Sequence, residues 1–232
     1  MEQEFPPLAQ RTLKENVTNI LRQSIVDGSL APGSELNQAQ IAEKLGVSRG
    51  PIREALGKLE QEGLIRTVPY KGVFITPLDR QYVEELYSVR ALLETMALER
   101  GIERMTDDDL SILRRYVDEM RLAAQAENTK LLLSVDLQFH EHIVRMAQHD
   151  IALRLWKQLE VGVQRCVYTQ HRIYEMLEEV VGSHPILVEA IAARNVESAV
   201  EILHKHISES ADHIVHNWPT SLDSPMEEDL SD

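Results

Sequence analysis

Residues 79–217 contain almost no proline or glycine, and this scarcity of helix-breaking residues constrains the fold more than any other feature of the chain. Residues 1–78, by contrast, are punctuated by both. No strand-like alternation appears in the later part, where apolar residues recur at helical spacing. The sequence therefore predicts a mainly α protein with a boundary near residues 76–79: a mixed first domain at 1–78, then an all-α bundle of six helices at 79–217.

The distribution of charge divides the chain at the same place. Residues 1–78 carry nine basic and nine acidic residues, whereas residues 79–232 carry 15 basic and 29 acidic residues, which accounts for the net charge of −14. A uniformly basic nucleic-acid-binding surface is thereby excluded, and any contact with DNA must be local. The segment 218–232, which from Pro219 onward holds two prolines, five acidic residues and no basic one, is predicted to be a disordered acidic tail.

Cysteine content and apolar runs indicate the compartment. The chain has one cysteine, Cys166, so no internal disulfide is possible. Residues 1–4 lack the basic start and apolar stretch of a signal peptide, and no apolar run approaches the ~20 residues of a membrane span. We therefore expect a cytoplasmic protein without membrane association.

The N-terminal part has the pattern of a helix-turn-helix. Helical spacing of apolar residues runs over residues 8–27, and a short second helix begins after the cap Asn37 and ends at Gly46. A third helix is expected from its cap, Ser48, to about Glu62. The apolar positions expected to face the core of this domain are Leu13, Val17, Ile20, Leu21, Ile25, Ile52, Leu56 and Leu59.

The third helix presents two arginines near its N-terminus. Arg49 and Arg53 are spaced i, i+4, away from the apolar face of the helix, with Gly50 and Gly57 beside them. The N-terminal residues of a recognition helix meet base edges in the major groove, where arginine can donate two hydrogen bonds to guanine. Small neighbouring residues would let the backbone approach the DNA.

Two short strands are expected after this helix, at residues 64–68 and 72–76, around a turn that contains Lys71. A hairpin with a basic tip is a wing that can reach phosphate or the minor groove. An arginine pair alone is usually only a solvated surface, and a basic hairpin tip often serves solubility. Both together around a helix-turn-helix predict a winged helix-turn-helix DNA-binding domain.

The run LGVSRGPIREAL from Leu45 to Leu56, with the later residues Leu59, Glu62-Gly63-Leu64 and Lys71-Gly72, resembles the DNA-binding signature of the GntR family. The resemblance covers residues 10–76. The positions that it implies in contact with operator DNA, together with the basic residue of the wing, are Ser48, Arg49, Arg53, Lys71 and Gly72. A two-fold dimer would place two recognition helices on a palindromic operator, so a homodimer is expected.

Six helices are expected in the later part of the chain. Thr106 and Asp109 have the spacing of a capping box, with Asp replacing the usual Glu. The first runs from the cap Asp79 to about Gly101, the second begins at Thr106, and the third covers about 129–148. The fourth begins near Ile151 and continues past Tyr168, the fifth begins after the cap Ser183, and the sixth covers about 196–216.

Polar residues interrupt the apolar stripes of these helices. Asp136 and His140 are spaced i, i+4 within the apolar stripe of the helix expected at 129–148, so their side chains point the same way. His206 continues the apolar face of the last helix, and His184 lies in the first turn of the fifth. A carboxylate in an apolar interior is costly unless a cation or metal ion balances it. One Asp and three His form a donor set suited to Zn²⁺, Ni²⁺, Mn²⁺ or Fe²⁺.

These histidines also have simpler interpretations. An inward histidine is more often a satisfied core or interface residue, and an Asp–His pair at this spacing can be only a buried hydrogen-bonded pair. Nothing in the spacing shows that His184 and His206 converge on the other two residues. His204 lies off the apolar stripe and is expected to be exposed, and His213, two turns beyond His206, is a weaker candidate.

The order and spacing of the four polar residues resemble the FCD ligand-binding domain of the FadR subfamily, which follows a GntR module in the same order. The resemblance spans residues 80–216 and implies a six- or seven-helix bundle that holds a divalent metal, zinc in preference to nickel, manganese or iron, beneath a small carboxylate effector. It also implies that Arg90 faces the effector, although a pair between Arg90 and Glu94 is an equally good interpretation. The implied metal ligands are Asp136, His140, His184 and His206.

The sequence therefore predicts a DNA-binding transcription regulator, a repressor in preference to an activator, controlled by a small carboxylate over a metal ion. Two alternatives stay open. One is a metal-dependent enzyme, since an open metal site could activate water. A helix-turn-helix serves no purpose in hydrolysis, however. No further carboxylate lies at a spacing that would identify it as a general base, so we expect no enzyme. The other alternative is a regulator whose metal is purely structural.

Overall fold

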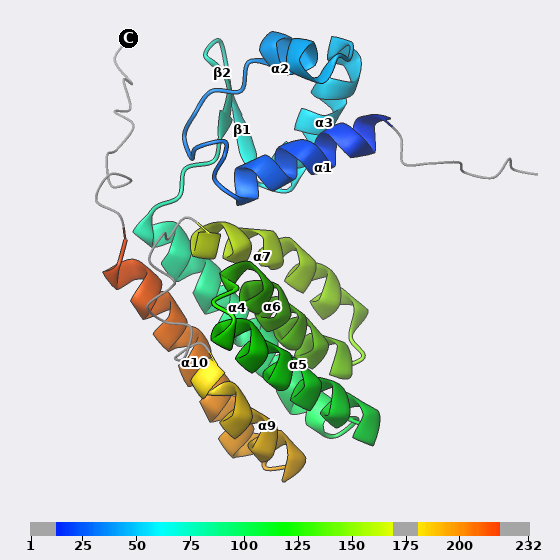
Figure 1. The fold of residues 1–232 in the computed structure, drawn as a ribbon, viewed down its shortest axis with the longest axis vertical. Helices are drawn as coiled ribbons and strands as arrows, with labels where there is room; N and C mark the ends of the chain where they lie inside the picture. Colours follow the sequence, from blue (N-terminus) through cyan, green and yellow to red (C-terminus); the bar gives the residue numbers. More distant parts are fainter. Residues whose placement is uncertain (1–12, 169–180, 219–232) are drawn as a thin grey trace, which may run out of the picture. The chain divides into compact units, whose positions relative to one another are not determined.

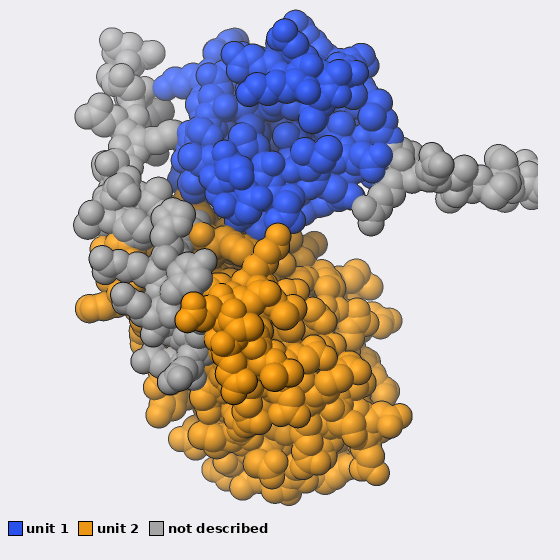
Figure 2. Space-filling model, in the orientation of Figure 1, with its two compact units in different colours: residues 1–77 blue, residues 78–232 orange. Residues whose placement is uncertain are grey.

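The structure is a computed structural model that describes residues 13–168 and 181–218. The chain separates into two compact units, unit 1 at residues 1–77 and unit 2 at residues 78–232, which are coloured separately in Figure 2. Within the described ranges, no helix has both the length and the apolarity needed to cross a membrane. The start of the first expected helix, the continuation of the fourth beyond Tyr168 and the expected tail from Pro219 lie outside the described residues.

Unit 1 consists of three helices and a two-stranded hairpin (Figure 1). Helix α1 packs on α3, α2 also packs on α3, and the hairpin follows α3 directly. Val17 and Leu21 of α1 and Ile52 and Leu59 of α3 are buried in the core of the unit, as predicted. The elements are α1 (Leu13–Val26), α2 (Gln38–Leu45), α3 (Arg49–Gln61), β1 (Ile65–Val68) and β2 (Gly72–Ile75).

Two residues of the predicted stripe of α1 do not belong to the core. Leu13 and Ile20 are 51 % and 49 % exposed, so their prediction as core residues was wrong. The inward face of α1 follows Val17, Leu21 and Ile25, which are spaced i, i+4, i+8. Ile20 lies to the side of that line, and Leu13 is the first described residue of the helix.

The helix-turn-helix is held by local capping chemistry. Asn37 accepts hydrogen bonds from the backbone N–H groups of Ala39 and Gln40, and Gly46 ends α2 in a left-handed conformation with φ 65°. Ser48 occupies the N-cap position of α3, as expected, but its side chain makes no capping hydrogen bond. The exposed hydroxyl of Ser48 therefore stands at the start of α3 without a capping role.

The predicted hairpin is present, and its antiparallel strands pair Val68 with Gly72. Tyr70 at its tip has φ 62°, and the backbone N–H of Lys71 donates to the carbonyl of Val68. Gly72 has φ 125°, and a Cβ atom there would lie 3.1 Å from the carboxylate of Glu35. Any other residue at position 72 would be strained in this turn.

Six helices form the described part of unit 2, and no strand occurs there, which confirms the predicted mainly α fold with a helical bundle (Figure 1). Helix α4 packs against α6, α7 and α10, and α6 packs against α4, α5 and α7; α5 also packs against α9. The helices are α4 (Arg80–Ile102), α5 (Asp107–Gln125), α6 (Thr129–Met146), α7 (Asp150–Tyr168), α9 (His184–Ala192) and α10 (Val196–His216).

The ends of these helices follow the expected signals with small differences. The capping box is confirmed: the Thr106 side chain accepts from the Asp109 N–H, and the Asp109 side chain accepts from the Thr106 N–H. Helix α6 ends at Met146 rather than at Gln148, which has a left-handed φ of 50°. Trp218, assigned to the tail by the sequence, is instead buried with the core of unit 2.

Candidate metal centre

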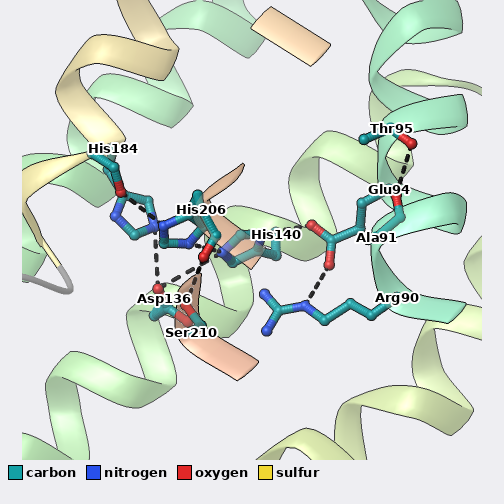
Figure 3. Close-up of polar contacts among 10 residues, drawn as sticks. Arg90, Ala91, Glu94, Thr95, Asp136, His140, His184, His206 and Ser210 are labelled. Atoms are coloured by element: carbon teal, nitrogen blue, oxygen red, sulfur yellow. Dashed lines mark hydrogen bonds and ion pairs between the residues drawn. The ribbon is translucent and has the colours of Figure 1, made fainter. Parts of the chain in front are cut away.

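Four polar side chains from three helices meet inside unit 2 (Figure 3). Asp136 and His140 come from α6, His184 is the first residue of α9, and His206 lies on α10. One possible ligand atom from each side chain lies within 4.8 Å of every other. The structure thus brings together the four residues whose convergence the sequence left open.

The nitrogens and oxygen that face one another in this cluster are close. The Nε2 atoms of His140 and His206 are 3.2 Å apart. The Oδ1 atom of Asp136 is 3.1 Å from Nε2 of His184 and 3.8 Å from Nε2 of His140. His140 and His184 are fully buried, and the ring of Phe139 packs edge-on against His184 with 4.7 Å between centroids. The cluster is therefore enclosed rather than a surface group of charges.

Outer contacts orient two of the imidazole rings. Nδ1 of His140 lies 2.6 Å from Oε2 of Glu94, and Nδ1 of His206 lies 2.7 Å from the hydroxyl of Ser183. Ser183 is the N-cap residue of α9, but its hydroxyl makes no capping hydrogen bond, so the predicted capping role was wrong. The hydroxyl contacts His206 instead, and both rings present Nε2 to the centre of the cluster.

The electrostatic environment sets the protonation state of the cluster. Burial lowers the pKa of His140, and burial together with the neighbouring imidazoles lowers the pKa of His206 well below its usual value. Burial acts to raise the pKa of Asp136, but His140, His184 and Arg90 outweigh it, so the pKa of this carboxyl is lowered. Neutral imidazoles and an ionised carboxylate are the forms that bind metal ions.

This donor set fits a divalent metal ion. Two ligand atoms about 2.1 Å from one ion lie about 3–4.2 Å apart, depending on the angle between them. The three measured separations, 3.1, 3.2 and 3.8 Å, fall within that interval. Nε2 of His140 carries a lone pair, because its Nδ1 donates to a carboxylate, and that lone pair faces Nε2 of His206. A cation between the two nitrogens would turn this contact into ligation.

Arg90 and Glu94 form a buried ion pair on α4 beside the cluster. Nε of Arg90 donates to Oε1 of Glu94 over 2.6 Å, so the pairing considered from the sequence is present. The guanidinium nevertheless points toward Asp136 (Figure 3), and its buried Nη2 atom has no hydrogen-bond partner. Burial acts to lower the pKa of Arg90, but Glu94 outweighs it and the pKa is raised, so the guanidinium stays charged.

Sequence reasoning did not identify Glu94 as part of the site. Glu94 is 0 % exposed and contacts both Arg90 and the cluster ligand His140. Burial acts to raise the pKa of Glu94, but His140 and Arg90 together lower it, so the carboxylate is ionised. The available signal was its i, i+4 spacing from Arg90 on a helix whose neighbouring positions are apolar.

A cavity of about 70 Å³ opens beside the cluster. Asp136, His206 and Arg90 form its polar end. His213, the weaker candidate of the sequence, lines this cavity but does not belong to the cluster, and His204 is exposed, as expected. The remaining lining residues are Tyr87, Leu133, Leu137, Val163, Gln164, Val167, Tyr168, Ser210 and Ile214.

In unit 1, the residues of α3 that are expected to contact DNA have exposed side chains. Ser48, Arg49 and Arg53 are exposed, and within the described ranges neither arginine is paired with an acidic side chain. Arg22 of α1 donates two hydrogen bonds to the carboxylate of Glu62 at the end of α3, over 2.8 and 2.7 Å. This bidentate pair braces α3 against α1.

The expected contact residues of the wing lie at the tip of the hairpin. Lys71 is exposed, and Gly72 adopts the left-handed backbone described above. Tyr70, which precedes them, has its side chain fully in solvent. The tip thus presents a cation, an aromatic ring and a glycine together.

Comparisons with known proteins match both units. Residues 13–75 match the family model "Bacterial regulatory proteins, gntR family", and residues 85–209 match the model "FCD domain". The chain is 28 % identical to the uncharacterized HTH-type transcriptional regulator YdhC of Bacillus subtilis, over 85 % of this chain and 89 % of that protein. It is 27 % identical to the gluconate operon transcriptional repressor of the same species, over 85 % of this chain and 83 % of that protein.

A solved structure shows the same fold. The structure of McbR/YncC of E. coli superposes with a TM-score of 0.75 at 23 % identity, over 90 % of this chain and 100 % of that chain. A putative GntR transcriptional regulator of Rhodococcus sp. RHA1 gives the same TM-score at 22 % identity, over 89 % of this chain and 99 % of that chain.

Proposed function

Because the chain belongs to the GntR family of bacterial regulatory proteins and carries an FCD domain after its helix-turn-helix, we propose that a small carboxylate metabolite controls its binding to operator DNA. The chain is a DNA-binding transcription regulator and not an enzyme. The metal-dependent enzyme that the sequence left open is therefore set aside. Operator DNA lies in the bacterial cytoplasm, so the proposal places the protein there.

One observation supports this mechanism: Asp136 and His206 of the cluster line the same cavity as Arg90, whose buried Nη2 atom has no hydrogen-bond partner. In this proposal Asp136, His140, His184 and His206 hold a divalent ion, which supplies a Lewis acid at the cavity wall. Arg90 donates from Nη2 to a carboxylate oxygen of the effector. The apolar residues of the wall enclose the carbon chain of the ligand.

The chemistry of the donors and the size of the cavity restrict the metal and the effector. Three imidazoles and one carboxylate suit zinc, and nickel, manganese or iron are the alternatives that the same donors accept. A cavity of about 70 Å³ suits a small ligand rather than a long acyl chain. The name of the gluconate operon repressor connects one relative with a small hydroxycarboxylate. We assign the effector of this chain to the same broad class, the small carboxylates.

Recognition of DNA belongs to α3 and the wing in this proposal. Arg49 and Arg53 donate to base edges in the major groove, because both guanidiniums are exposed and free of acidic partners within the described residues. The hydroxyl of Ser48 and the ammonium of Lys71 contact phosphates. Gly72 lets the backbone of the wing approach the duplex.

The proposed regulator is a homodimer on a palindromic operator. Two recognition helices related by a two-fold axis match two half-sites. An exposed apolar stripe on α4, formed by Val89, Leu92 and Met96, supports a second copy of the chain as the partner, since monomers rarely leave such stripes in water. An effector that prefers one dimer geometry then changes operator affinity by its differential binding, and we propose that it releases a repressor.

The proposal is tested by measuring the affinity for operator DNA with and without the effector, and with and without the metal ion. Duplexes selected from a random library by the protein itself serve as operator probes, and fluorescence anisotropy gives their dissociation constants. We expect one member of a panel of small carboxylates, gluconate included, to weaken binding at least about tenfold. Chelation should abolish this response, and added Zn²⁺ should restore it. A response that chelation leaves unchanged would mean that any bound metal is purely structural.

Matched histidine variants separate the metal centre from general effects of substitution. His206→Ala removes a donor of the cluster, whereas His204→Ala changes an exposed histidine on the same helix. We expect His206→Ala to lose bound metal and the carboxylate response, and His204→Ala to keep both. Equal metal content in the two purified variants, measured by elemental analysis, would refute the assignment of the ligands.

A further inference from the structure

We propose that Glu94 is a positioning residue of the metal centre, which holds His140 in its metal-binding tautomer and anchors Arg90 at the same cavity. Glu94 is 0 % exposed and bridges two helices through one carboxylate: Oε1 accepts from Nε of Arg90 on α4, and Oε2 accepts from Nδ1 of His140 on α6 (Figure 3). Both donor–acceptor distances are 2.6 Å. The part of the inference that concerns the effector rests on the proposed function.

The bridge determines which nitrogen of His140 carries the proton. A carboxylate can only accept, so the ring must donate from Nδ1, and Nε2 then keeps its lone pair. That lone pair points into the cluster, 3.2 Å from Nε2 of His206 and 3.8 Å from Oδ1 of Asp136. A carboxylate on the far nitrogen also fixes the ring orientation and makes the imidazole a stronger metal ligand. Without Glu94, either nitrogen of His140 could carry the proton.

The same carboxylate fixes the guanidinium that borders the cavity. Glu94 engages Nε of Arg90, while the buried Nη2 has no hydrogen-bond partner. The faces of Tyr87 and Trp156 lie 5.3 and 5.4 Å from the guanidinium carbon and limit its movement. Glu94 therefore supports one metal ligand and the anchor of the carboxylate at once. Metal ion and carboxylate should consequently bind cooperatively, each strengthening the other by the same factor.

The competing interpretation is that Glu94 merely neutralises the buried Arg90. This interpretation predicts no effect on His140 once both charges are removed together. Glu94→Leu alone would leave a buried guanidinium without its counter-charge and threaten folding. The double variant Arg90→Met/Glu94→Leu replaces the pair by apolar side chains of similar size, an exchange that proteins often tolerate. Arg90→Met alone likewise leaves the buried carboxylate of Glu94 without its counter-charge, so circular dichroism must first show that it folds; it keeps the contact of Glu94 with His140.

The first measurement is the tautomer of His140 in metal-free protein, read from the ¹⁵N chemical shifts of its imidazole. We expect the Nδ1–H tautomer in the wild type and in Arg90→Met, and a substantial Nε2–H population in Arg90→Met/Glu94→Leu. A purely structural role for Glu94 would not change this signal. Glu99→Leu, which changes an exposed carboxylate on the same helix, serves as the control.

The second measurement is Zn²⁺ affinity by competition with a chromophoric chelator. Arg90→Met should bind Zn²⁺ within about twofold of the wild type, and the double variant should bind it about 10–100-fold more weakly. An unchanged tautomer and unchanged affinity in the double variant would overturn the inference. A wild type that binds no Zn²⁺ would instead contradict the proposed function, and the tautomer of the metal-free protein would then decide the role of Glu94 alone.

Discussion

In the proposed function, Arg49 and Arg53 recognise the base sequence of the operator. Both are exposed on α3 and, within the described residues, have no acidic partner that would compete with DNA. A bidentate contact from arginine to guanine contributes about 1–3 kcal/mol of discrimination between bases. Specific binding should therefore depend on these two residues far more than on other cations of the same helix.

We expect Arg49→Ala to reduce affinity for a selected operator at least about tenfold and to leave affinity for random duplex nearly unchanged. Lys58→Ala, which removes a positive charge from the last turn of α3, is the matched control. It should lower both affinities by a similar small factor. Equal losses for the two variants on the selected operator, measured by anisotropy at fixed salt, would contradict base recognition by Arg49.

Cys166 offers a residue-scale test of the packing of unit 2. It is fully buried on α7, and burial raises the pKa of its thiol to about 12. At pH 8 the folded protein should therefore not react with a disulfide-exchange reagent, because almost no thiolate is present and access is blocked. One equivalent should react after unfolding in guanidinium chloride. Rapid stoichiometric labelling of the native protein would show that α7 is not packed as described.

At the scale of elements, the capping box of α5 ties stability to pH. Burial acts to raise the pKa of Asp109, but hydrogen bonds from Thr106 and the nearby His142 outweigh it, so the pKa is lowered. A carboxyl whose pKa is lower in the folded state stabilises the fold above its unfolded pKa of about 3.9. That contribution is lost as the pH falls through the lower, folded value.

Asp109→Asn should accordingly reduce the free energy of unfolding by about 1 kcal/mol at pH 7. The difference from the wild type should shrink as the pH falls from about 4 through the lower pKa of the folded carboxyl, below which the wild-type group is also neutral. Asp108→Asn, in the same helical turn but exposed, controls for the helix dipole. Urea unfolding curves at pH 7 and at a pH below the folded pKa of Asp109 give the free energy of unfolding of both variants. A loss of stability in Asp109→Asn that does not depend on pH would contradict the ionised cap.

In the proposed function, helix α4 has two roles on opposite faces. Its buried face carries Arg90 and Glu94, and its exposed stripe includes Leu92, which is 70 % exposed. If the stripe joins two copies of the chain, Leu92→Glu should yield monomers in light scattering and weaken operator binding, because one recognition helix alone is held less tightly. Leu122→Glu on α5, where the leucine is 65 % exposed, should remain dimeric. Identical masses for both variants would remove α4 from the interface.

Local patterns predict the elements better than they predict the site. The spacing of Asp136 and His140 on α6 could be read directly, because neighbours at i, i+4 share a face of one helix. Their approach to His184 and His206 depends on how α6, α9 and α10 pack, which no local pattern encodes. Family resemblance supplied that convergence.

The hardest side chains to predict were those that could have served a role within their own helix, such as a cap or a surface ion pair. Ser48 and Ser183 both stand at N-cap positions, yet neither hydroxyl caps its helix, and that of Ser183 contacts His206 instead. Glu94 at i+4 from Arg90 has the spacing of an ordinary surface ion pair. Only the packing of other helices around α4 shows that this pair is buried and that Glu94 reaches His140.

At the scale of the whole molecule, one chain joins a DNA-binding unit to a helical unit that carries the candidate metal centre. Unit 1 has no excess of either charge, whereas the rest of the chain is strongly acidic. In the proposed function, attraction to DNA therefore depends on the local cations of α3 and the wing, and the acidic remainder disfavours indiscriminate binding. In the proposed function, the metabolite acts through the geometry of the dimer rather than by contacting DNA.

The most direct test of the metal centre is anomalous X-ray diffraction at the zinc absorption edge, from crystals of the protein loaded with Zn²⁺. The account predicts one strong peak per chain, with the Nε2 atoms of His140, His184 and His206 and an oxygen of Asp136 each about 2.0–2.2 Å away. Zinc found only at surface histidines, with these four side chains in contact with one another and no peak between them, would contradict it.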